Sequence, residues 1–166
     1  MMDDWRRSGP SMQVNIAYAK PRVLYVTVRA GRLTFDILVA HCPTSSATIE
    51  AYYEYIQELR SVVRKCHKDG VRLFMAIDGN CKLGSVQSTA VGPHGADKET
   101  KRGALLHSFL VENEVFLPAT FAETAHASSE HGTWMSPMGG ETRGDYIACP
   151  GDLLPGTRGA RRLEEV

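Results

Sequence analysis

The chain has 166 residues, of which 43% are hydrophobic and 23% charged, enough for one domain with a sizeable core. Lysine plus arginine and aspartate plus glutamate both number 19, so the formal net charge is zero. This balance argues against tight, non-specific coating of nucleic acid by the chain alone. It still allows a metal-dependent nuclease, because a bound cation supplies positive charge at the phosphate.

The cysteines and the apolar runs limit the setting in which the chain is expected to work. The four cysteines form no Cys-x-x-Cys pair, which favours neither a disulfide framework nor a zinc site. We therefore expect reduced thiols in an intracellular compartment, with nucleus and cytoplasm not distinguished. No apolar run approaches the roughly 20 residues that span a bilayer, and the N-terminus has no secretory signal, so we expect no membrane association.

The first part of the chain predicts a β-hairpin. Residues 1–20 are weakly patterned and are expected to form a poorly ordered lead-in. Residues 23–28 and 33–41 are apolar runs on either side of a Gly-containing turn, the usual signature of two paired strands. The second strand ends at His41.

An amphipathic helix is predicted next, over residues 47–68, because apolar residues recur there every three or four positions. Ser45 or Ser46 can cap its start. Residues 71–77 then form a short apolar strand that ends just before Asp78. A strand, helix and strand of this length make an α/β crossover, which brings the ends of both strands to one edge of a sheet.

The remaining elements follow a polar loop at residues 81–99. They are a helix at 100–112, short strands at 115–117 and 119–121, and a final pair of strands at 133–135 and 144–148. We expect one partial domain over residues 21–152, followed by an irregular, charged tail at 153–166.

Asp78 and Asn80 carry the strongest chemical signal. Residues two apart in an extended chain face the same way, so a carboxylate and an amide would point at one spot. The carboxylate can orient or deprotonate a water, and the amide can donate to a phosphate oxygen. Taken alone, Asp78-Gly79-Asn80 is also an ordinary turn sequence.

His41 and Asp145 are weaker candidates. His41 is either a half-buried strand-end histidine or a group that hydrogen-bonds or protonates a phosphoryl oxygen. Asp145 stands in an apolar strand, where a carboxylate is costly unless paired. It can pair with Arg143, cap a loop, or orient a catalytic histidine.

The order of these segments resembles the endonuclease/exonuclease/phosphatase superfamily, above all its retrotransposon-encoded endonucleases and craniofacial-development-like proteins. The resemblance runs from about Arg22 to Asp152, and the order of its motifs is specific although each motif is short. The stretches that carry it are VAHCPT (39–44), AIDGNCKLG (76–84), GPHG (92–95), RG (102–103), TF (120–121), TW (133–134) and RGDYI (143–147).

The resemblance implies a DNase I-like, two-sheet α/β sandwich that depends on Mg²⁺ or Mn²⁺ and cleaves DNA phosphodiesters. By this resemblance Asp78 would activate the water, Asn80 would hold the phosphate, His41 would contact the scissile phosphate, and Asp145 would orient the catalytic histidine. A reverse transcriptase domain in the parent element is a further implied partner. The resemblance implies nothing about oligomeric state.

Several departures bear on activity. The usual Gly-Asp-Phe-Asn becomes Ile77-Asp78-Gly79-Asn80, and Gly144 replaces an Ile. The family's early strands, with an Asn and a metal-binding Glu, have no counterpart before Arg22. Its closing Ser-Asp-His has none after His131, so we expect a domain truncated at both ends, without the principal metal ligand.

Three functions stay open. The first is a metal-dependent DNA endonuclease by descent, with weak or absent activity in this chain, because groups that act as a unit fail together. The second is a non-catalytic remnant or binding module, which the missing ligands favour. The third is a phosphatase of the same superfamily.

Overall fold

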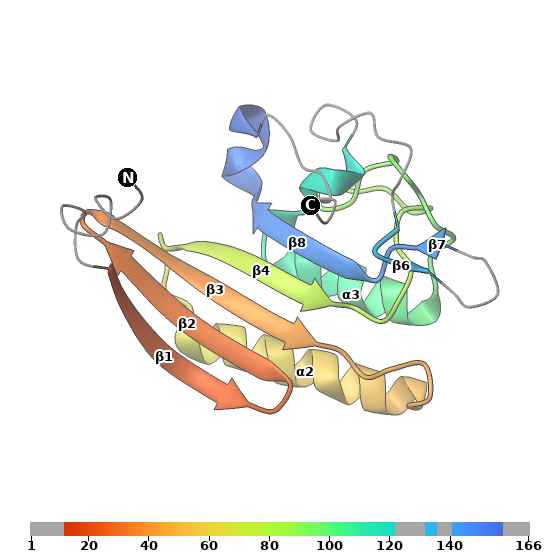
Figure 1. Ribbon diagram of the computed structural model, residues 1–166, viewed down its shortest axis with the longest axis horizontal. Helices are drawn as coiled ribbons and strands as arrows, with labels where there is room; N and C mark the ends of the chain where they lie inside the picture. Colours follow the sequence, from red (N-terminus) through yellow and green to blue (C-terminus); the bar gives the residue numbers. More distant parts are fainter. Residues whose placement is uncertain (1–11, 122–131, 136–140, 158–166) are drawn as a thin grey trace, which may run out of the picture.

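The computed structural model describes residues 12–121, 132–135 and 141–157. A six-stranded sheet has the order β1-β2-β3-β4-β8-β5, and a separate ribbon pairs β6 with β7 (Figure 1). The strands are β1 (Met12–Lys20), β2 (Val23–Ala30), β3 (Leu33–His41), β4 (Arg72–Asp78), β5 (Val115–Phe116), β6 (Trp134–Met135), β7 (Glu141–Thr142) and β8 (Asp145–Pro150). The helices are α2 (Ile49–Cys66) and α3 (Lys101–Glu112), with 3₁₀ turns η1 (Pro118–Thr120) and η2 (Gly151–Gly156).

The predicted hairpin and crossover are both present. β2 and β3 pair antiparallel around the turn at Gly31, whose φ of 61° suits a residue without a side chain. Helix α2 then carries the chain back so that β4 pairs parallel with β3. The α/β class predicted from the sequence is confirmed.

One face of the sheet, here called the inner face, packs against both helices. Its strands contribute Tyr25, Leu38 and Met75 to a single buried cluster with Ile56 of α2 and Phe109 of α3. Figure 1 shows α2 and α3 on the same side of the sheet. The hydrophobic core of the described chain therefore lies between this face and the two helices.

A charged side chain is also buried on the inner face. Asp36 of β3 is 2% exposed and accepts hydrogen bonds from the hydroxyls of Tyr25 and Thr27, both at 2.7 Å. Its Oδ2 also lies 2.9 Å from Nδ1 of His67, at the end of α2. Desolvation, reinforced by the bond to Asp36, raises the pKa of Tyr25. These bonds satisfy a carboxylate that would otherwise be costly to bury, and they tie the hairpin to the helix.

The opposite, outer face is also apolar. Its residues follow from the pairing registers, since directly paired residues point to the same face. Val39 is 41% exposed and Ile147 is 63% exposed, whereas Leu38, next to Val39 on the inner face, is fully buried. Within the described chain, the two α-helices cover one face of the sheet, and the other apolar face is left partly exposed.

The edge strand β1 changes face part-way along. Val14 and Ile16 lie on the outer face, and a register shift follows between Ile16 and Tyr18. Tyr18 consequently points inward, and its hydroxyl donates to Glu58 of α2 at 2.7 Å. The bulge lets one strand present apolar side chains outward and still reach the helix.

Four expectations need correction. The lead-in expected over residues 1–20 is wrong for residues 12–20, which form β1; residues 1–11 lie outside the described chain. Thr48, rather than Ser45 or Ser46, caps α2. Residues 118–120 form η1, because Pro118 starts a tight turn and suits a strand poorly. The first residues of the expected irregular tail form η2, and residues 158–166 lie outside the description.

The last two strands predicted from the sequence, at 133–135 and 144–148, do not pair with each other. β6 pairs with β7, whereas β8 enters the main sheet between β4 and β5. This arrangement brings Asp145 to the same sheet edge as Asp78. None of the helices in the described part of the chain is long and apolar enough to cross a membrane.

Candidate active site

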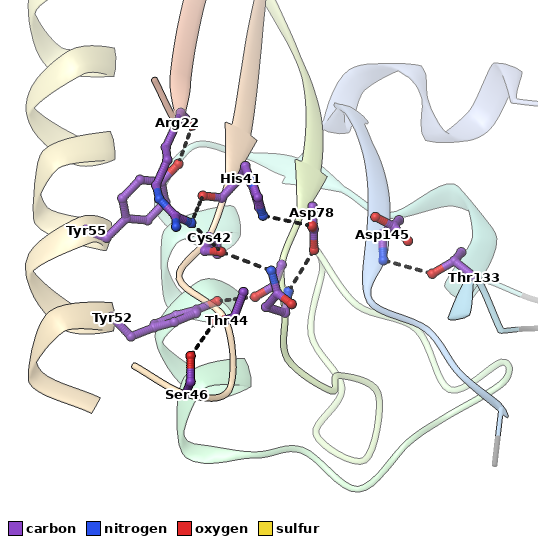
Figure 2. Close-up of polar contacts among 12 residues, drawn as sticks. Arg22, His41, Cys42, Thr44, Ser46, Tyr52, Tyr55, Asp78, Thr133 and Asp145 are labelled. Carbon is purple, nitrogen blue, oxygen red and sulfur yellow. Dashed lines mark hydrogen bonds and ion pairs between the residues drawn. The ribbon is translucent and has the colours of Figure 1, made fainter. Parts of the chain in front are cut away.

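Three strand ends carry ionisable side chains in one row. His41 on β3 is in register with Asp78 on β4, and Asp78 is in register with Asp145 on β8. Nε2 of His41 lies 3.3 Å from Oδ2 of Asp78, and both side chains are about half exposed, at 53% and 41%. Figure 2 shows the row along the ends of the strands. All three residues lie on the outer face of the sheet.

Asp78 and Asn80 meet through a turn rather than an extended chain. The backbone N–H of Asn80 donates to Oδ1 of Asp78 at 3.2 Å, and Asn80 has a φ of 45°. Asparagine tolerates this left-handed conformation better than most residues. The extended geometry expected from the sequence is therefore wrong locally, although the two side chains remain neighbours.

The side-chain amide of Asn80 is partly committed to the protein. Its Nδ2 donates to the carbonyl of Cys42, in the loop that follows β3, at 3.0 Å. This bond ties the turn after β4 to the loop after β3. A phosphate contact from Asn80 would have to use the second N–H of the amide.

Buried hydrogen bonds hold the turn from below. The hydroxyl of Tyr52 on α2 donates to the carbonyl of Gly79 at 2.8 Å, and the N–H of Gly79 donates to the carbonyl of Gly144 at 2.7 Å. A Cβ added at Gly79 would lie 3.0 Å from Leu106 and 3.1 Å from Tyr146. The turn that carries Asp78 is thus fixed by both the helix and β8.

The loop after β3 is anchored by arginines. Arg22 donates to the carbonyls of His41 and Cys42, both at 3.4 Å, and Tyr55 of α2 holds the carbonyl of Arg22 at 2.7 Å. Arg102 of α3 donates to carbonyls in the next turn of the loop, among them that of Thr44 at 2.7 Å. Arginine side chains from neighbouring elements therefore hydrogen-bond to the carbonyls of this loop.

The first turn of helix α3 approaches the segment after β4 closely because it contains a glycine. A Cβ at Gly103 would lie 2.1 Å from the carbonyl oxygen of Lys82, so a larger residue would push the helix away. The RG pair in the sequence thus combines an anchoring arginine with the small residue that lets its helix approach.

Asp145 is positioned by the TW stretch. The hydroxyl of Thr133 accepts from the backbone N–H groups of Gly144 and Asp145, both at 3.0 Å (Figure 2). Asp97 holds the approach to this strand, since its Oδ2 accepts from the hydroxyl of Thr142 at 3.2 Å and from the N–H of Arg143 at 3.4 Å. The carboxylate of Asp145 is left at an exposed position beside Asp78.

The side chains beneath the row are buried, among them Cys42, Cys81 and Tyr52. Burial raises the pKa of Cys42 to about 12, and burial raises that of Cys81 to about 12 as well. Burial is also the main cause that raises the pKa of Tyr52, which lies between them. The exposed row of His41, Asp78 and Asp145 therefore stands above groups that stay neutral.

This arrangement can accept and donate protons at an exposed strand edge. Asp78 can take a proton from a water, and His41 beside it can donate one, provided that a substrate reaches the row. Asp78 and Asp145 are directly opposed carboxylates, an unfavourable pairing that a cation or a proton would relieve.

The described residues do not form a complete protein cage for a divalent cation. Mg²⁺ demands a nearly octahedral set of oxygen ligands, and it commonly takes only one or two carboxylates from the protein and the rest from waters and substrate phosphates. The described chain supplies two neighbouring carboxylates here, and within it no group of three His, Cys, Asp or Glu side chains could hold a metal ion.

The structure brings together all four residues singled out from the sequence, namely His41, Asp78, Asn80 and Asp145. The supports were missed. Asp97 lies in a loop, where no periodicity marks it. Thr133 and Arg102 belong to stretches that carry the family resemblance, and that resemblance was the available signal for them.

Solved structures with the same fold are known. No protein-family model matches the sequence, and no curated protein matches it. The endonuclease domain of TRAS1, a telomere-specific non-LTR retrotransposon, superposes with a TM-score of 0.56 and 19% identity over 87% of this chain and 56% of that one. A 3′-5′ exonuclease of Neisseria meningitidis superposes with a TM-score of 0.56 and 12% identity, over 89% and 60%.

A mannosyl-6-phosphatase of Bacteroides thetaiotaomicron shares the fold as well, with a TM-score of 0.54 and 11% identity over 83% of this chain and 53% of that one. The chain thus spans between about half and three fifths of the length of these three structures. At such low identity the likeness concerns the fold. The chain has the DNase I-like α/β fold of endonuclease/exonuclease/phosphatase proteins, as its motifs predicted.

Proposed function

We propose that this chain carries the water-activating and phosphate-facing side of a DNA phosphodiesterase site, and that on its own it hydrolyses DNA slowly or not at all. The observation that carries the proposal is the register of His41, Asp78 and Asp145 across three adjacent strand ends. Exposed, opposed carboxylates beside an imidazole suit proton transfer at a bound phosphate.

Asp78 is the proposed base for the attacking water. Its Oδ1 is held by the N–H of Asn80 and its Oδ2 by His41, so the carboxylate is oriented before a substrate arrives. The second amide N–H of Asn80 and the ring of His41 are the proposed donors to the phosphate oxygens. Asp145, on the other side of Asp78 from His41, is proposed to add negative charge to the row.

DNA is the proposed substrate class because proteins of the same fold act on it. One matched structure is a retrotransposon endonuclease domain, and another is a Neisseria 3′ phosphatase bound to a product DNA hairpin. The same resemblance proposes Mg²⁺ or Mn²⁺ as cofactor and a reverse transcriptase domain in the parent element. The low activity is proposed because the described residues do not complete a metal site.

The test is nicking of supercoiled plasmid at high protein concentration, with Mg²⁺ or Mn²⁺ and with EDTA. We expect slow, metal-dependent nicking that Asp78→Ala abolishes. Asp152→Ala is the matched control, because Asp152 is also an exposed aspartate and is ion-paired with Arg72 at the other end of β4. Fast nicking, or nicking that survives Asp78→Ala, would contradict the proposal.

If the wild-type chain does not nick the plasmid, a DNA-binding measurement distinguishes the proposed DNA site from a non-catalytic remnant. Fluorescence anisotropy with a short DNA duplex should show weak binding that His41→Ala and Asn80→Gly reduce several-fold and Asp152→Ala does not. Asn80→Gly keeps the left-handed backbone accessible and removes the amide. Absence of both nicking and binding would leave the non-catalytic remnant as the better reading.

A phosphatase is the second candidate, favoured by the mannosyl-6-phosphatase that shares the fold. Release of inorganic phosphate from a sugar phosphate, without any plasmid nicking, would replace the DNA proposal by this one. In that assay too, Asp78→Ala should abolish activity, and Asp152→Ala is the matched control.

A further inference from the structure

The outer face of the main sheet is apolar from edge to edge. The residues that point to it from five strands are Met12, Val14, Ile16, Leu24, Val26, Val28, Leu33, Phe35, Ile37, Val39, Phe74, Ala76 and Ile147. Charged side chains stand only at its ends among these registers, with Arg72 at one end and the row from His41 to Asp145 at the other. We call this surface the outer apolar face.

Part of the outer apolar face is open to solvent, although Val26 and Val28 of β2 are buried, at 9% and 5% exposed. Met12 is 69% exposed, Ile16 63% and Ile147 63%, on strands at opposite sides of it. In its centre the rings of Phe35 and Phe74 pack edge to face, 5.6 Å apart. Contiguous apolar surface of this extent is uncommon on a monomer and marks an interaction site.

The shape of the face selects the kind of partner. Five strands at about 4.8 Å spacing make it roughly 24 Å wide, whereas a helix with its side chains is about 10 Å across. A second sheet, packed face to face at about 10 Å, matches such a surface.

We infer that the outer apolar face binds the same face of a second copy of this chain, giving a two-fold symmetric dimer with both helical layers outside. The second copy supplies a sheet of matching width, and the neutral net charge of the chain opposes no self-association. An isologous interface requires a self-complementary surface, and an apolar face whose charged side chains stand only at its ends meets that requirement.

The area is sufficient for such a dimer. Strands of about seven residues at about 3.3 Å each give a footprint on the order of 550 Å² per copy, or about 1,100 Å² for the pair. That reaches the lower range of specific interfaces. His41, Asp78 and Asp145 lie on the same face at its rim, so the partner copy would border the candidate site.

The experiment is sedimentation velocity, together with light scattering after size exclusion, on the full chain from about 1 to 100 μM. We expect the wild-type chain to have twice the mass of one chain. Ile16→Lys, Val39→Lys and Ile147→Lys should each weaken dimerisation by at least tenfold. These positions are exposed, so circular dichroism should show folded variants.

Matched controls are Val86→Lys and Val111→Lys, at apolar positions that are 52% and 42% exposed and lie in the loop after β4 and on α3. They should leave the dimer unchanged. Ile147→Lys also separates face docking from pairing of the edge strand β1, because β8 lies four strands away from that edge.

Three outcomes would overturn the inference. They are a monomer at every concentration, a dimer that all three face variants leave intact, and a dimer that Ile16→Lys disrupts while Ile147→Lys does not. The last outcome would assign the contact to the β1 edge. The mass measurement needs no nuclease activity, so it fails or succeeds independently of the proposed function.

Discussion

The two faces of the main sheet are made of similar side chains and have different surroundings. Leu38 on the inner face is fully buried beneath the helices, whereas its neighbour Val39 on the outer face is 41% exposed. The difference teaches that apolar residues on both sides of a strand indicate two surfaces that are to be covered. It does not follow that the same chain covers both of them. The candidate site belongs to the open face.

The largest effect is expected for the buried carboxylate of the inner face. Asp36→Ala removes the acceptor for Tyr25 and Thr27 and the partner of His67, so it should lower the free energy of unfolding by about 3–5 kcal/mol. Urea unfolding followed by circular dichroism measures it. Asp152→Ala, at an exposed ion pair, is the control and should cost well under 1 kcal/mol.

Alanine substitutions at two adjacent residues of β3 compare the inner and outer faces of the sheet directly. Leu38→Ala should cost about 3 kcal/mol because it leaves a cavity in the packed core. Val39→Ala should cost below about 1 kcal/mol in dilute protein, since its side chain is already partly in water. Equal losses in urea unfolding at sub-micromolar concentration would mean that the outer face is covered within the single chain.

Stability measured over a pH series tests whether the two thiols beneath the site are buried. Burial raises the pKa of Cys42 and Cys81 from 9.0 to about 12, so the folded state holds their protons more tightly than the unfolded state does. Stability should therefore be insensitive to these thiols below about pH 8 and should fall as pH rises from about 9 towards 12. At pH 10 the loss should be about 1 kcal/mol per thiol.

The matched variant for the pH series is Cys42→Ala with Cys81→Ala. It should fall less steeply above pH 9 than the wild type. Tyr52 and Tyr146, whose pKa values burial also raises, should keep part of the slope. An unchanged slope in the double variant would show that the thiols do not titrate in this way.

The smallest effect is expected at the rim of the open face. Asp145→Asn removes one of two opposed carboxylates, so it should raise the free energy of unfolding by a few tenths of a kcal/mol at low salt. Thermal unfolding at about 10 mM and 1 M salt measures it, with the gain shrinking at high salt. A loss of stability would indicate that Asp145 makes a favourable contact instead.

The elements between Val23 and Asp78 could be predicted because their signals are local. The alternation along the hairpin and the helical period of α2 fix the strands and the crossover. The crossover in turn brings His41 and Asp78 to the same end of the sheet, where the structure pairs them directly. The alternation of Met12, Val14 and Ile16 was a usable signal for β1, but the bulge before Tyr18 interrupts it.

The other half of the site depends on contacts that leave no local pattern. Which strand pairs with β4 is decided by tertiary packing, and β8 takes that place rather than pairing with β6. The left-handed turn at Asn80 was hidden by a tripeptide that fits both a turn and a strand end. Asp97 and Thr133 each act through two hydrogen bonds near the start of β8, which composition and periodicity do not reveal.

The pairings that build the candidate site also set when it can form. The hairpins β1-β2 and β2-β3 close over short loops, but His41 meets Asp78 across 37 residues (78 − 41) and Asp78 meets Asp145 across 67 (145 − 78). Loop closure at such separations makes pairing slow compared with a hairpin. The site should therefore assemble last during folding, after the three-stranded meander. Nascent or stalled chains would expose apolar strands before the candidate row of side chains has formed.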